Sequence, residues 1–431
     1  MKQFWLQFIY SFLVLCARHY IKRTEIKVIG ITGSVWKTSC RMLVSQVLQQ
    51  IPSSYKFYTS PKNYNSELWL VFSVFRIEEY SPSIKNLLWV SLKILTIAFF
   101  EAKKYDILVA EYGIDSPNDM EQLLKIAVPD IAILTKLDSV HSANYPGWIE
   151  QYWEEKWLLL LSAKNKIFVN LQDEYSQDKV HLLEEYSELF WNIDELNLKL
   201  QKLSESEIVR SFTYRDKNFS INLIGEENVH YTKLAIDIAE FLWIYLDRNQ
   251  YNFNFKLQEG RFTIFNKWQN VFIDSTYNAA PESTKLAIEN TQVLRDELYE
   301  NHKIIFVLWD MRELWTVSES AHKSLAKKIL SASAIFTVWP QMYEYLKPEL
   351  EIQKYQWYLK SGLSSRETWK NVKKYLKDNH ETQYIILFKG SQNTIFTEEA
   401  LWCLLTQAEQ KRLPRQSESW KSKKDKFFMS V

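Results

Sequence analysis

The sequence predicts an α/β protein whose strands form two largely parallel sheets. Short apolar runs rich in β-branched residues alternate with longer stretches of helical character, a pattern typical of strand–helix–strand units. The runs are continuously apolar, as expected of parallel strands that are buried on both faces. A polar stretch at residues 247–255 separates an earlier set of runs from a later one. The chain of 431 residues is long enough for two or three domains.

The two sets of runs give the expected elements in order. In the first set, strands are predicted at residues 26–32, 105–113, 130–137 and 165–171, with helices between them, for instance at 38–50 and 118–127. In the second set, after Gly260, strands are predicted at 271–277, 303–310, 333–339 and 383–390. The resulting division is a helix at 1–24, a first domain at 25–248, a second domain at 249–410 and a basic tail at 411–431.

The N-terminal stretch is first apolar and then basic. Residues 4–17 are fewer than the ~17–25 that a membrane-spanning helix needs, and no small-x-small cleavage site of a secretory signal follows them. A basic cluster comes next, made up of Arg18, His19, Lys22 and Arg23. Two interpretations are open: a helix packed on the first domain, or a helix that lies in the membrane interface and binds anionic lipid. At the other end, the Lys-, Arg- and Ser-rich residues from 411 onward are expected to form a mobile, solvated tail.

The overall composition argues against several classes of function. The net charge is +1, so nothing favours a nucleic-acid partner. The cysteines, Cys16, Cys40 and Cys403, are too few and too scattered for a disulfide framework or a zinc site. Such cysteine usage fits a reducing compartment. We therefore expect a cytoplasmic protein, and we expect a monomer.

A phosphate-binding loop is predicted directly after the first strand. The loop consists of Gly33, Ser34, Val35, Trp36, Lys37, Thr38 and Ser39. Backbone N–H groups and the N-terminus of the following helix would face an anion. Lys37 would reach the β- and γ-phosphates of a nucleotide, and the Thr38 hydroxyl would bind Mg²⁺. The Gly-x-x-x-Lys-Thr pattern is weak alone, but the strand before it and the helix after it strengthen the prediction.

Further motifs connect this loop with the rest of the chain. In order, they are GITGSVWKTS (30–39), SPKNYNSELWL (60–70), VAEYGIDSPNDM (109–120), TKLDSVHSANYP (135–146), EEKWLLL (154–160), EGRF (259–262), IDSTYNAAPEST (273–284), VLWDMRELW (307–315) and FKGSQN (388–393). Together they resemble the Mur ligases, the ATP-dependent amide-bond-forming enzymes of peptidoglycan synthesis. The resemblance is greatest to the branch that adds D-alanyl-D-alanine to a UDP-N-acetylmuramoyl tripeptide.

The resemblance implies both a fold and a reaction. The fold is a central P-loop-type ATPase domain with a parallel sheet, followed by a Rossmann-like C-terminal domain. In the reaction, ATP phosphorylates a carboxylate to an acyl phosphate, which the incoming amine attacks. Because negative charge gathers at the transferred phosphoryl group, cations and aimed donors carry most of the catalysis. The implied cofactors are ATP and Mg²⁺, and the implied partners are a muramoyl peptide and D-Ala-D-Ala.

The resemblance also implies roles for charged residues of the first domain. Glu111 matches a carboxylate that binds Mg²⁺, an ion that prefers hard oxygen ligands. His141 matches a ligand of a second metal ion. Lys156 matches a lysine that the family carbamylates, which turns a cation into an anion able to bind metal. The expected metal ligands are therefore Thr38, Glu111, His141 and Lys156, and the expected catalytic residues are Lys37, Lys156, His141 and Arg261.

Other positions are matched in loops and at strand ends. Arg261 would act on phosphates, since its rigid fork suits oxyanions. Asn278 matches a residue that reads adenine, and Asp274 lies in the same nucleotide-contacting strand end. The implied substrate-binding residues are Asn63, Asn65, Asp310, Lys389 and Ser391; Arg312 and Glu313 accompany Asp310. For each of these residues, an ordinary capping, turn or surface role is the alternative.

One departure from the family concerns the substrate. The first predicted strand begins at residue 26, so the family's separate UDP-binding N-terminal domain is expected to be missing. The substrate would then be held by other surfaces or by a partner, or be presented in a lipid-linked form. Two further functions stay open. One is a related ligase that acts on a lipid-linked or other carboxylate, and the other is an inactive scaffold that docks at the membrane through residues 1–23.

A second departure is an exchange of glycine for tryptophan. The sequence holds 17 tryptophans and 8 glycines, where average usage would give roughly 30 glycines. Trp36 stands at a family glycine position, where the backbone needs positive φ or approaches a ligand closely. The same exchange is predicted for Trp69, Trp157, Trp191, Trp309, Trp315 and Trp339. Because the charged residues of the site are kept, we hypothesise that many of these codons are UGA and are translated as glycine; the alternative is a tryptophan-rich inactive homologue.

Overall fold

In a computed structural model, the chain divides into two compact units. The structure describes residues 2–61, 67–78, 80, 83–137, 148–189, 196–204, 207–311, 314, 317–338, 340–356, 358–362, 364–390 and 396–430. The first unit consists of Met1–Asn197, Phe212–Phe219 and Glu226–Phe255, and the second of Leu198–Ser211, Ser220–Gly225 and Lys256–Val431. The chain passes into the second unit for the last time after Phe255, at the end of the polar stretch in which the sequence predicts a boundary.

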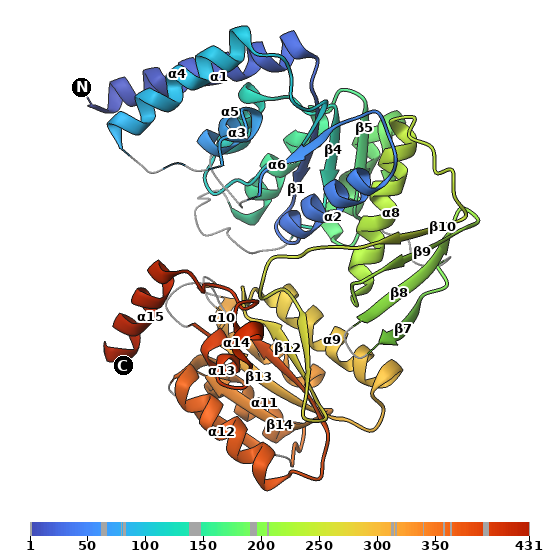
Figure 1. Ribbon diagram of the computed structural model, residues 1–431, viewed down its shortest axis with the longest axis vertical. Coiled ribbons are helices and arrows are strands. Elements are labelled where there is room, and N and C mark those ends of the chain that lie inside the picture. The colour runs from blue at the N-terminus through green and yellow to red at the C-terminus, as the bar shows by residue number, and fades with distance from the viewer. Residues whose placement is uncertain are drawn as a thin grey trace. The chain divides into compact units, whose positions relative to one another are not determined.

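A six-stranded parallel sheet forms the centre of the first unit, with the strand order β2-β3-β1-β4-β5-β6 (Figure 1). The strands are β1 Lys27–Thr32, β2 Phe57–Thr59, β3 Ile107–Glu111, β4 Ile131–Leu134, β5 Lys166–Val169 and β6 Ser187–Leu189. The four strands that the sequence predicts here are confirmed as β1, β3, β4 and β5. Side chains on both faces of β1, such as Val28 and Ile29, are buried, as expected of a continuously apolar strand. The short strands β2 and β6 were not predicted.

Helices cover both faces of this sheet (Figure 1). One face carries α3 Glu67–Val74, α5 Asp119–Ile126 and α6 Trp148–Leu161, with α1 Lys2–Thr24 and α4 Ile84–Phe100 beyond them. The other face carries α2 Lys37–Gln50 and α8 Glu226–Phe241, and α7 Glu174–Lys179 and a 3₁₀ helix Val180–Tyr186 lead into β6. Leu13, Ala17 and Tyr20 of α1 are buried in the core, so the first of the two open interpretations, a helix packed on the first domain, is confirmed. Within the described residues, no helix has both the length and the apolar character to cross a membrane.

A second, smaller sheet was not predicted. It has four strands in the order β10-β9-β8-β7, with β7 antiparallel to β8. The strands are β7 Lys199–Ser204, β8 Glu207–Tyr214, β9 Lys217–Ile221 and β10 Gln250–Phe253. Buried and accessible side chains alternate in β10, as is common in a half-solvated antiparallel sheet.

The second unit is built on another six-stranded sheet, with the order β11-β12-β16-β13-β14-β15. The strands are β11 Thr263–Lys267, β12 Asn270–Ser275, β13 Lys303–Trp309, β14 Ala332–Val338, β15 Tyr358–Gly362 and β16 Tyr384–Lys389. Only β11 runs antiparallel to its neighbour within this sheet. The four predicted strands of this domain are confirmed as β12, β13, β14 and β16.

Helices also lie on both faces of the second unit's sheet, and each face has its own core. One core contains side chains of α9 Pro281–Leu298 and α11 Pro340–Ile352, and the other contains side chains of α12 Ser365–Asp378 and α13 Glu398–Trp402. The remaining helices are α10 Ser318–Ser324, a 3₁₀ helix Ala326–Lys328, α14 Gln407–Gln410 and α15 Glu418–Ser430.

The expectation of a mobile, solvated tail from residue 411 onward is wrong. The segment contains the helix α15. Two basic side chains of the segment bind a buried carboxylate. Arg415 bonds the Glu398 carboxylate at 2.6 and 2.9 Å, and Lys424 Nζ lies 2.9 Å from the same group. Because Glu398 is fully buried, these two cations supply the paired charges that a buried carboxylate needs.

Two exposed tryptophans outside the predicted exchange sites have a left-handed backbone. Trp243 has a φ of 60° and follows α8, where Ile244 N–H bonds Ala239 O at 2.8 Å. Trp268 has a φ of 50° and forms, with Gln269 at a φ of 65°, the two-residue turn between β11 and β12. Glycine is the usual residue at such a helix end and is favoured in such a hairpin turn. The backbone at both positions therefore fits the hypothesis that UGA codons are translated as glycine.

We expect Trp243→Gly and Trp268→Gly each to raise the free energy of unfolding by about 1 kcal/mol. A left-handed conformation costs an L-residue roughly 1–2 kcal/mol, and these indoles are 78% and 66% exposed, so little packing is lost. The matched control is Trp89→Gly in the middle of α4, where the indole is 64% exposed. Glycine inside a helix should lower stability there by about 1 kcal/mol. Urea unfolding followed by circular dichroism measures both effects, and a loss of stability at residues 243 and 268 would contradict the argument.

Candidate active site

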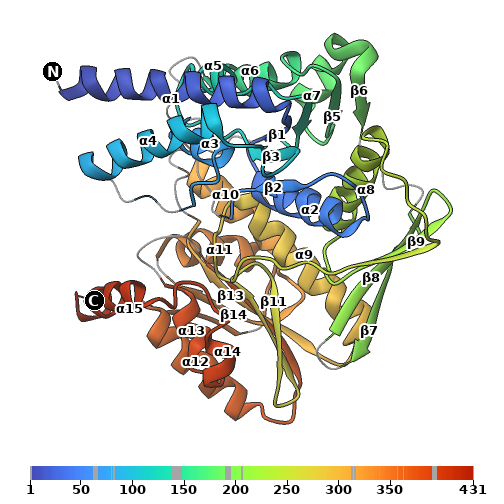
Figure 2. The same ribbon diagram turned by 45° about the horizontal axis from the view of Figure 1, so that its top comes forward.

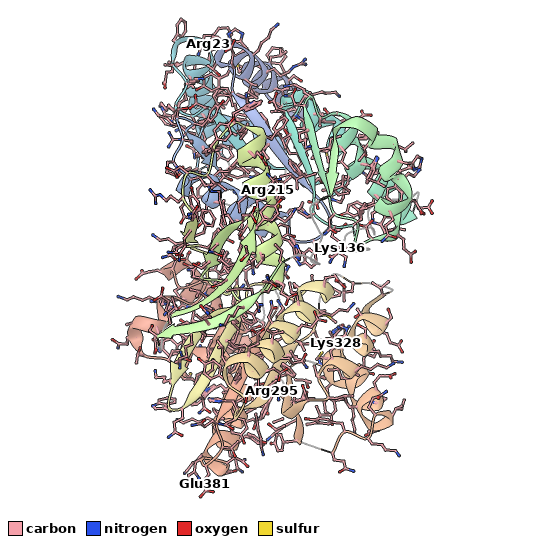
Figure 3. All side chains as sticks on the ribbon, turned by 90° about the vertical axis from the view of Figure 1, so that its right-hand side faces the viewer. Arg23, Lys136, Arg215, Arg295, Lys328 and Glu381 are labelled. Atoms are coloured by element: carbon pink, nitrogen blue, oxygen red, sulfur yellow. The ribbon has the colours of Figure 1, made fainter. Side chains whose placement is uncertain are left out.

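The predicted phosphate loop joins β1 to α2 and is braced by the residues after β4. Gly33 has a φ of 143°, and a Cβ there would lie 2.1 Å from Thr135 Oγ1, so no other residue fits. Ser34 N–H donates to Lys136 O at 2.8 Å, and the Thr135 hydroxyl donates to Val35 O at 2.6 Å. Lys136 is labelled in Figure 3. The loop is therefore a fixed turn with a glycine at its start, as the sequence predicts.

Trp36 is the residue that immediately precedes α2, and its backbone is left-handed. Its φ is 66° and its ψ is 1°, and no side-chain hydrogen bond caps the helix. Glycine adopts this conformation without the steric cost that a Cβ imposes. The indole is half-buried, and Lys136 Nζ lies 5.4 Å from its ring centroid. The backbone is therefore of the kind that the predicted glycine would take up, while the identity of residue 36 stays a prediction.

Lys37 folds back over the loop. Its Nζ donates to Gly33 O at 2.8 Å and to Ser34 O at 3.2 Å. Burial lowers the pKa of Lys37, while the carboxylates of Glu111 and Asp115 partly oppose this effect. The amine thus lies against the same backbone segment that would approach a phosphate.

Thr38 meets a carboxylate from the neighbouring strand. Its hydroxyl donates to Glu111 at 3.0 and 3.4 Å, because Glu111 ends β3 directly beside Ile31 of β1. Arg41, one helical turn after Lys37, places its Nε 3.5 Å from the same carboxylate and was missed by the sequence prediction. A hydroxyl and a carboxylate beside a phosphate loop are hard oxygen ligands of the kind that Mg²⁺ prefers, so the residues present fit this ion.

Lys156 is fully buried in α6. Its Nζ lies 4.3 Å from the Tyr152 ring centroid and has no hydrogen-bond partner among the described residues. Burial and the positive charge of Lys37 lower the pKa of Lys156 well below its ordinary value, against the opposing carboxylates of Asp115, Glu111 and Glu155. A lowered pKa favours the neutral amine, and the neutral amine is the form that adds CO₂ to become a carbamate.

A second group of predicted residues lies at strand ends of the second unit. Asp274 near the end of β12 and Lys389 at the end of β16 are both buried, and Lys389 Nζ donates to Ser275 Oγ at 3.4 Å. Burial raises the pKa of Asp274 to about 7, although hydrogen bonds from Thr276 act in the opposite direction. Burial and the nearby Arg261 lower the pKa of Lys389 to about 7.

These shifts predict a pH dependence of stability with two opposite slopes. Between pH 4 and 7 the folded chain keeps a proton on Asp274 that the unfolded chain has released, so the free energy of unfolding falls as pH rises, by up to about 1.4 kcal/mol per pH unit. Above pH 7 the unfolded chain holds a proton that Lys389 has lost, so stability rises with pH. Urea unfolding across this range measures both slopes. Asp274→Asn should remove the lower slope and Lys389→Met the upper one; unchanged slopes would refute the assignment.

Three further predicted residues of this unit, Arg261, Asn278 and Asp310, contact neighbouring residues of the same unit. The Arg261 guanidinium carbon lies 4.6 Å from the Tyr277 ring centroid. Asn278 is exposed, and its side-chain oxygen accepts a bond from Ala279 N–H at 2.8 Å. Asp310 accepts bonds from Gln341 and Met342 N–H at 3.3 and 2.6 Å, and therefore caps α11. The capping role that was the alternative for Asp310 is thus present, and a substrate-binding role stays a prediction.

Several predicted residues lie outside the described part of the chain. They are Asn63, Asn65, His141, Arg312, Glu313, Ser391, Trp191, Trp315 and Trp339. Within the described part, no group of three or more His, Cys, Asp or Glu side chains could hold a metal ion. Of the predicted residues that the structure describes, Lys37, Thr38, Glu111 and Lys156 lie close to one another in the first unit. Asp274 and Lys389 lie close to each other in the second unit.

Trp69, Trp157 and Trp309 do not share the backbone of Trp36. They lie in α3, in α6 and at the end of β13, and none of them has a positive φ. A need for a positive φ therefore does not explain a glycine at these three positions. Trp157 and Trp309 are buried, and their indole N–H groups have no hydrogen-bond partner among the described residues. An unsatisfied buried donor costs about 1–3 kcal/mol.

Comparisons with the sequences of known proteins agree with the predicted resemblance. Residues 31–239 match the model of the Mur ligase middle domain. A UDP-N-acetylmuramoyl-tripeptide--D-alanyl-D-alanine ligase of Bacillus subtilis is 24% identical over 381 residues, covering 87% of this chain and 75% of that protein. A protein of the same name from Borreliella burgdorferi is 24% identical over 388 residues, covering 87% and 74%.

Solved structures agree in fold. MurF from Acinetobacter baumannii matches with a TM-score of 0.70 at 18% identity, covering 92% of this chain and 80% of that one. The MurF ligase of Thermotoga maritima, solved in complex with ADP, matches with a TM-score of 0.67 at 20% identity, covering 91% and 82%. The α/β fold is confirmed, and the predicted resemblance is confirmed for residues 31–239, which match the Mur ligase middle domain.

Proposed function

We propose that this chain is an ATP-dependent amide-bond ligase that adds D-alanyl-D-alanine to a UDP-N-acetylmuramoyl tripeptide through an acyl phosphate. The relatives from Bacillus subtilis and Borreliella burgdorferi carry the name of this activity. The observation that carries the proposal is the contact between Thr38 and Glu111 at 3.0 Å, directly after a loop whose backbone leaves room only for glycine at residue 33. We also propose a cytoplasmic monomer that uses ATP and Mg²⁺ and contacts a membrane surface through residues 1–23.

The proposed roles follow from the chemistry of each side chain. Lys37 would exchange its bonds to two loop carbonyls for bonds to phosphate oxygens, which are stronger because both partners are charged. Thr38 and Glu111 would hold Mg²⁺, which supplies positive charge against the transferred phosphoryl group. Lys156, as a carbamate, would add a further anionic ligand. Arg261 and Asn278 keep the phosphate and adenine roles that the family resemblance implies.

Phosphate release by purified Trp36→Gly chain tests this proposal. We expect release only when a muramoyl tripeptide and D-Ala-D-Ala are both present, because the acyl phosphate needs an amine acceptor. Glu111→Gln in the same background is the control and should lower turnover by about a hundredfold or more, since it removes a charge from the metal site. Turnover with another carboxylate instead of the muramoyl tripeptide would favour a related ligase with a different substrate.

One observation favours the inactive scaffold as a second candidate. The indole of Trp36 belongs to the phosphate loop and is only half-buried. Part of it therefore lies on the accessible side of the loop, where the phosphates would bind. If the native chain carries tryptophan at residue 36, and if neither the tryptophan nor the glycine form hydrolyses ATP with any acceptor, the scaffold is the better conclusion.

A further inference from the structure

Helices α1 and α4 form a fixed pair on the first unit. They lie side by side in both ribbon views (Figures 1 and 2). The rings of His19 and Phe99 stack with centroids 4.4 Å apart. Arg23, labelled in Figure 3, donates from its guanidinium to Ala98 O at 3.1 Å and to Ile97 O at 3.3 Å. The last turn of α4 is therefore held by the last turn of α1, and the two helices present their outer sides together.

The outer sides of this pair are strongly apolar. Large apolar side chains that are 45–82% exposed occur on both helices, namely Phe8, Leu15, Leu88, Trp89, Leu92, Phe99 and Phe100. On α4, Leu88 and Leu92 are one turn apart and so share a face, which remains apolar even if residue 89 is glycine. Exposed apolar side chains gathered in this way mark an interaction site rather than an ordinary surface.

The charges of the pair are all of one sign. The sequence has no Asp or Glu within residues 2–24 or 84–100, and the basic residues in these stretches are Lys2, Arg18, Lys22, Arg23, Lys85 and Lys93. On α1 the exposed face passes from Phe8 and Leu15 to Arg18 and Lys22. An apolar face bordered by lysine and arginine suits the boundary between acyl chains and anionic headgroups.

We infer that α1 and α4 together form a docking surface for an anionic lipid bilayer. The pair would lie in the plane of the interface with its apolar side chains among the acyl chains and its basic groups at the headgroups. A second copy of this chain is a poorer occupant, because two such faces would bring only positive charges together. The inference assigns much of the apolar contact to α4, beyond residues 1–23, and it does not depend on the proposed ligase activity.

Sedimentation with lipid vesicles tests the inference on the full chain. We expect the chain to bind vesicles of phosphatidylglycerol and phosphatidylcholine in equal parts more strongly than vesicles of phosphatidylcholine alone. The double change Leu88→Glu and Leu92→Glu should weaken binding to the mixed vesicles by about tenfold or more, since it removes apolar burial and adds repulsion. The double change Lys85→Glu and Lys93→Glu should abolish most of the preference for anionic vesicles.

The matched control is Leu161→Glu at the end of α6, an exposed leucine outside the pair. It should leave vesicle binding unchanged, and circular dichroism confirms that each variant is folded. Hydrogen exchange provides a second measurement, because vesicles should slow amide exchange in α1 and α4. Absence of binding to any vesicle, equal losses in the Leu161 control, or a dimer that forms without lipid and is dispersed by the Leu88 and Leu92 changes would each overturn the inference. Ligase activity on soluble substrates reports separately on the proposed function.

Discussion

The Trp36→Gly chain binds ATP about a hundredfold more tightly than the chain with tryptophan at residue 36, an expected difference of ~2.7 kcal/mol. The reason is the loop itself: residue 36 already has the left-handed backbone of a glycine, and removal of the indole opens the space next to the N–H groups at the start of α2. A helix N-terminus then faces the phosphates directly. Isothermal titration calorimetry with ATP and Mg²⁺ measures the two affinities.

The matched control for this prediction is Trp268→Gly. It also removes an indole from a left-handed position, but this indole is exposed and belongs to a hairpin of the second unit, so the affinity for ATP should stay unchanged. Equal affinities of the tryptophan and glycine forms at residue 36 would show that the indole does not obstruct the loop. In native protein, the tryptic peptide of residues 28–37 should have the mass expected for glycine at residue 36, and UGA should stand at that codon.

Lys156→Arg, made in the Trp36→Gly background, lowers turnover by about a hundred- to a thousandfold, the size of effect expected when an aimed charge is lost from a phosphoryl-transfer site. Arginine has a similar length and cannot form a carbamate. Removal of CO₂ should reduce turnover of the parent chain in the same way, and added bicarbonate should restore it. Because burial lowers the pKa of the Lys156 amine and so favours its neutral form, the carbamate should form more readily than on an ordinary lysine and should be lost as pH falls.

A signal from ¹³C-labelled bicarbonate gives a readout that does not depend on activity. The parent chain should show a carbamate carbon resonance that is absent from Lys156→Arg. Lys164→Arg, a conservative change of an accessible lysine just after α6, is the control and should alter neither turnover nor the resonance. A parent chain that turns over fully without CO₂ and shows no resonance would exclude the carbamate.

The strands that were predicted and those that were missed differ in a physical way. β1, β4 and β13 are continuously apolar because both of their faces are covered, and such runs are visible in one sequence. β2 and β6 have three residues each, too few for any periodicity. The strands β7 to β10 carry many polar residues, and β9 pairs with β10, which follows it in the chain only after the helix α8.

The site was predictable where neighbours in sequence are neighbours in space. Lys37 and Thr38 follow a strand and open a helix, so the loop could be recognised locally. Glu111 reaches Thr38 only through the pairing of β1 with β3, and its role was suggested by family resemblance alone. The left-handed conformations of Trp243 and Trp268 had no local signal, because neither residue belongs to a recognised motif.

The buried ion cluster of Glu398, Arg415 and Lys424 bears on how the chain is synthesised. The carboxylate of Glu398 is made before both of its partners, Arg415 and Lys424. An unpaired charge cannot be buried without a penalty of several kcal/mol, so the region around Glu398 cannot reach its final packing before these two residues have been made. Completion of the second unit must therefore wait until Lys424 has left the ribosome, and a product truncated before Arg415 would expose that region to proteases.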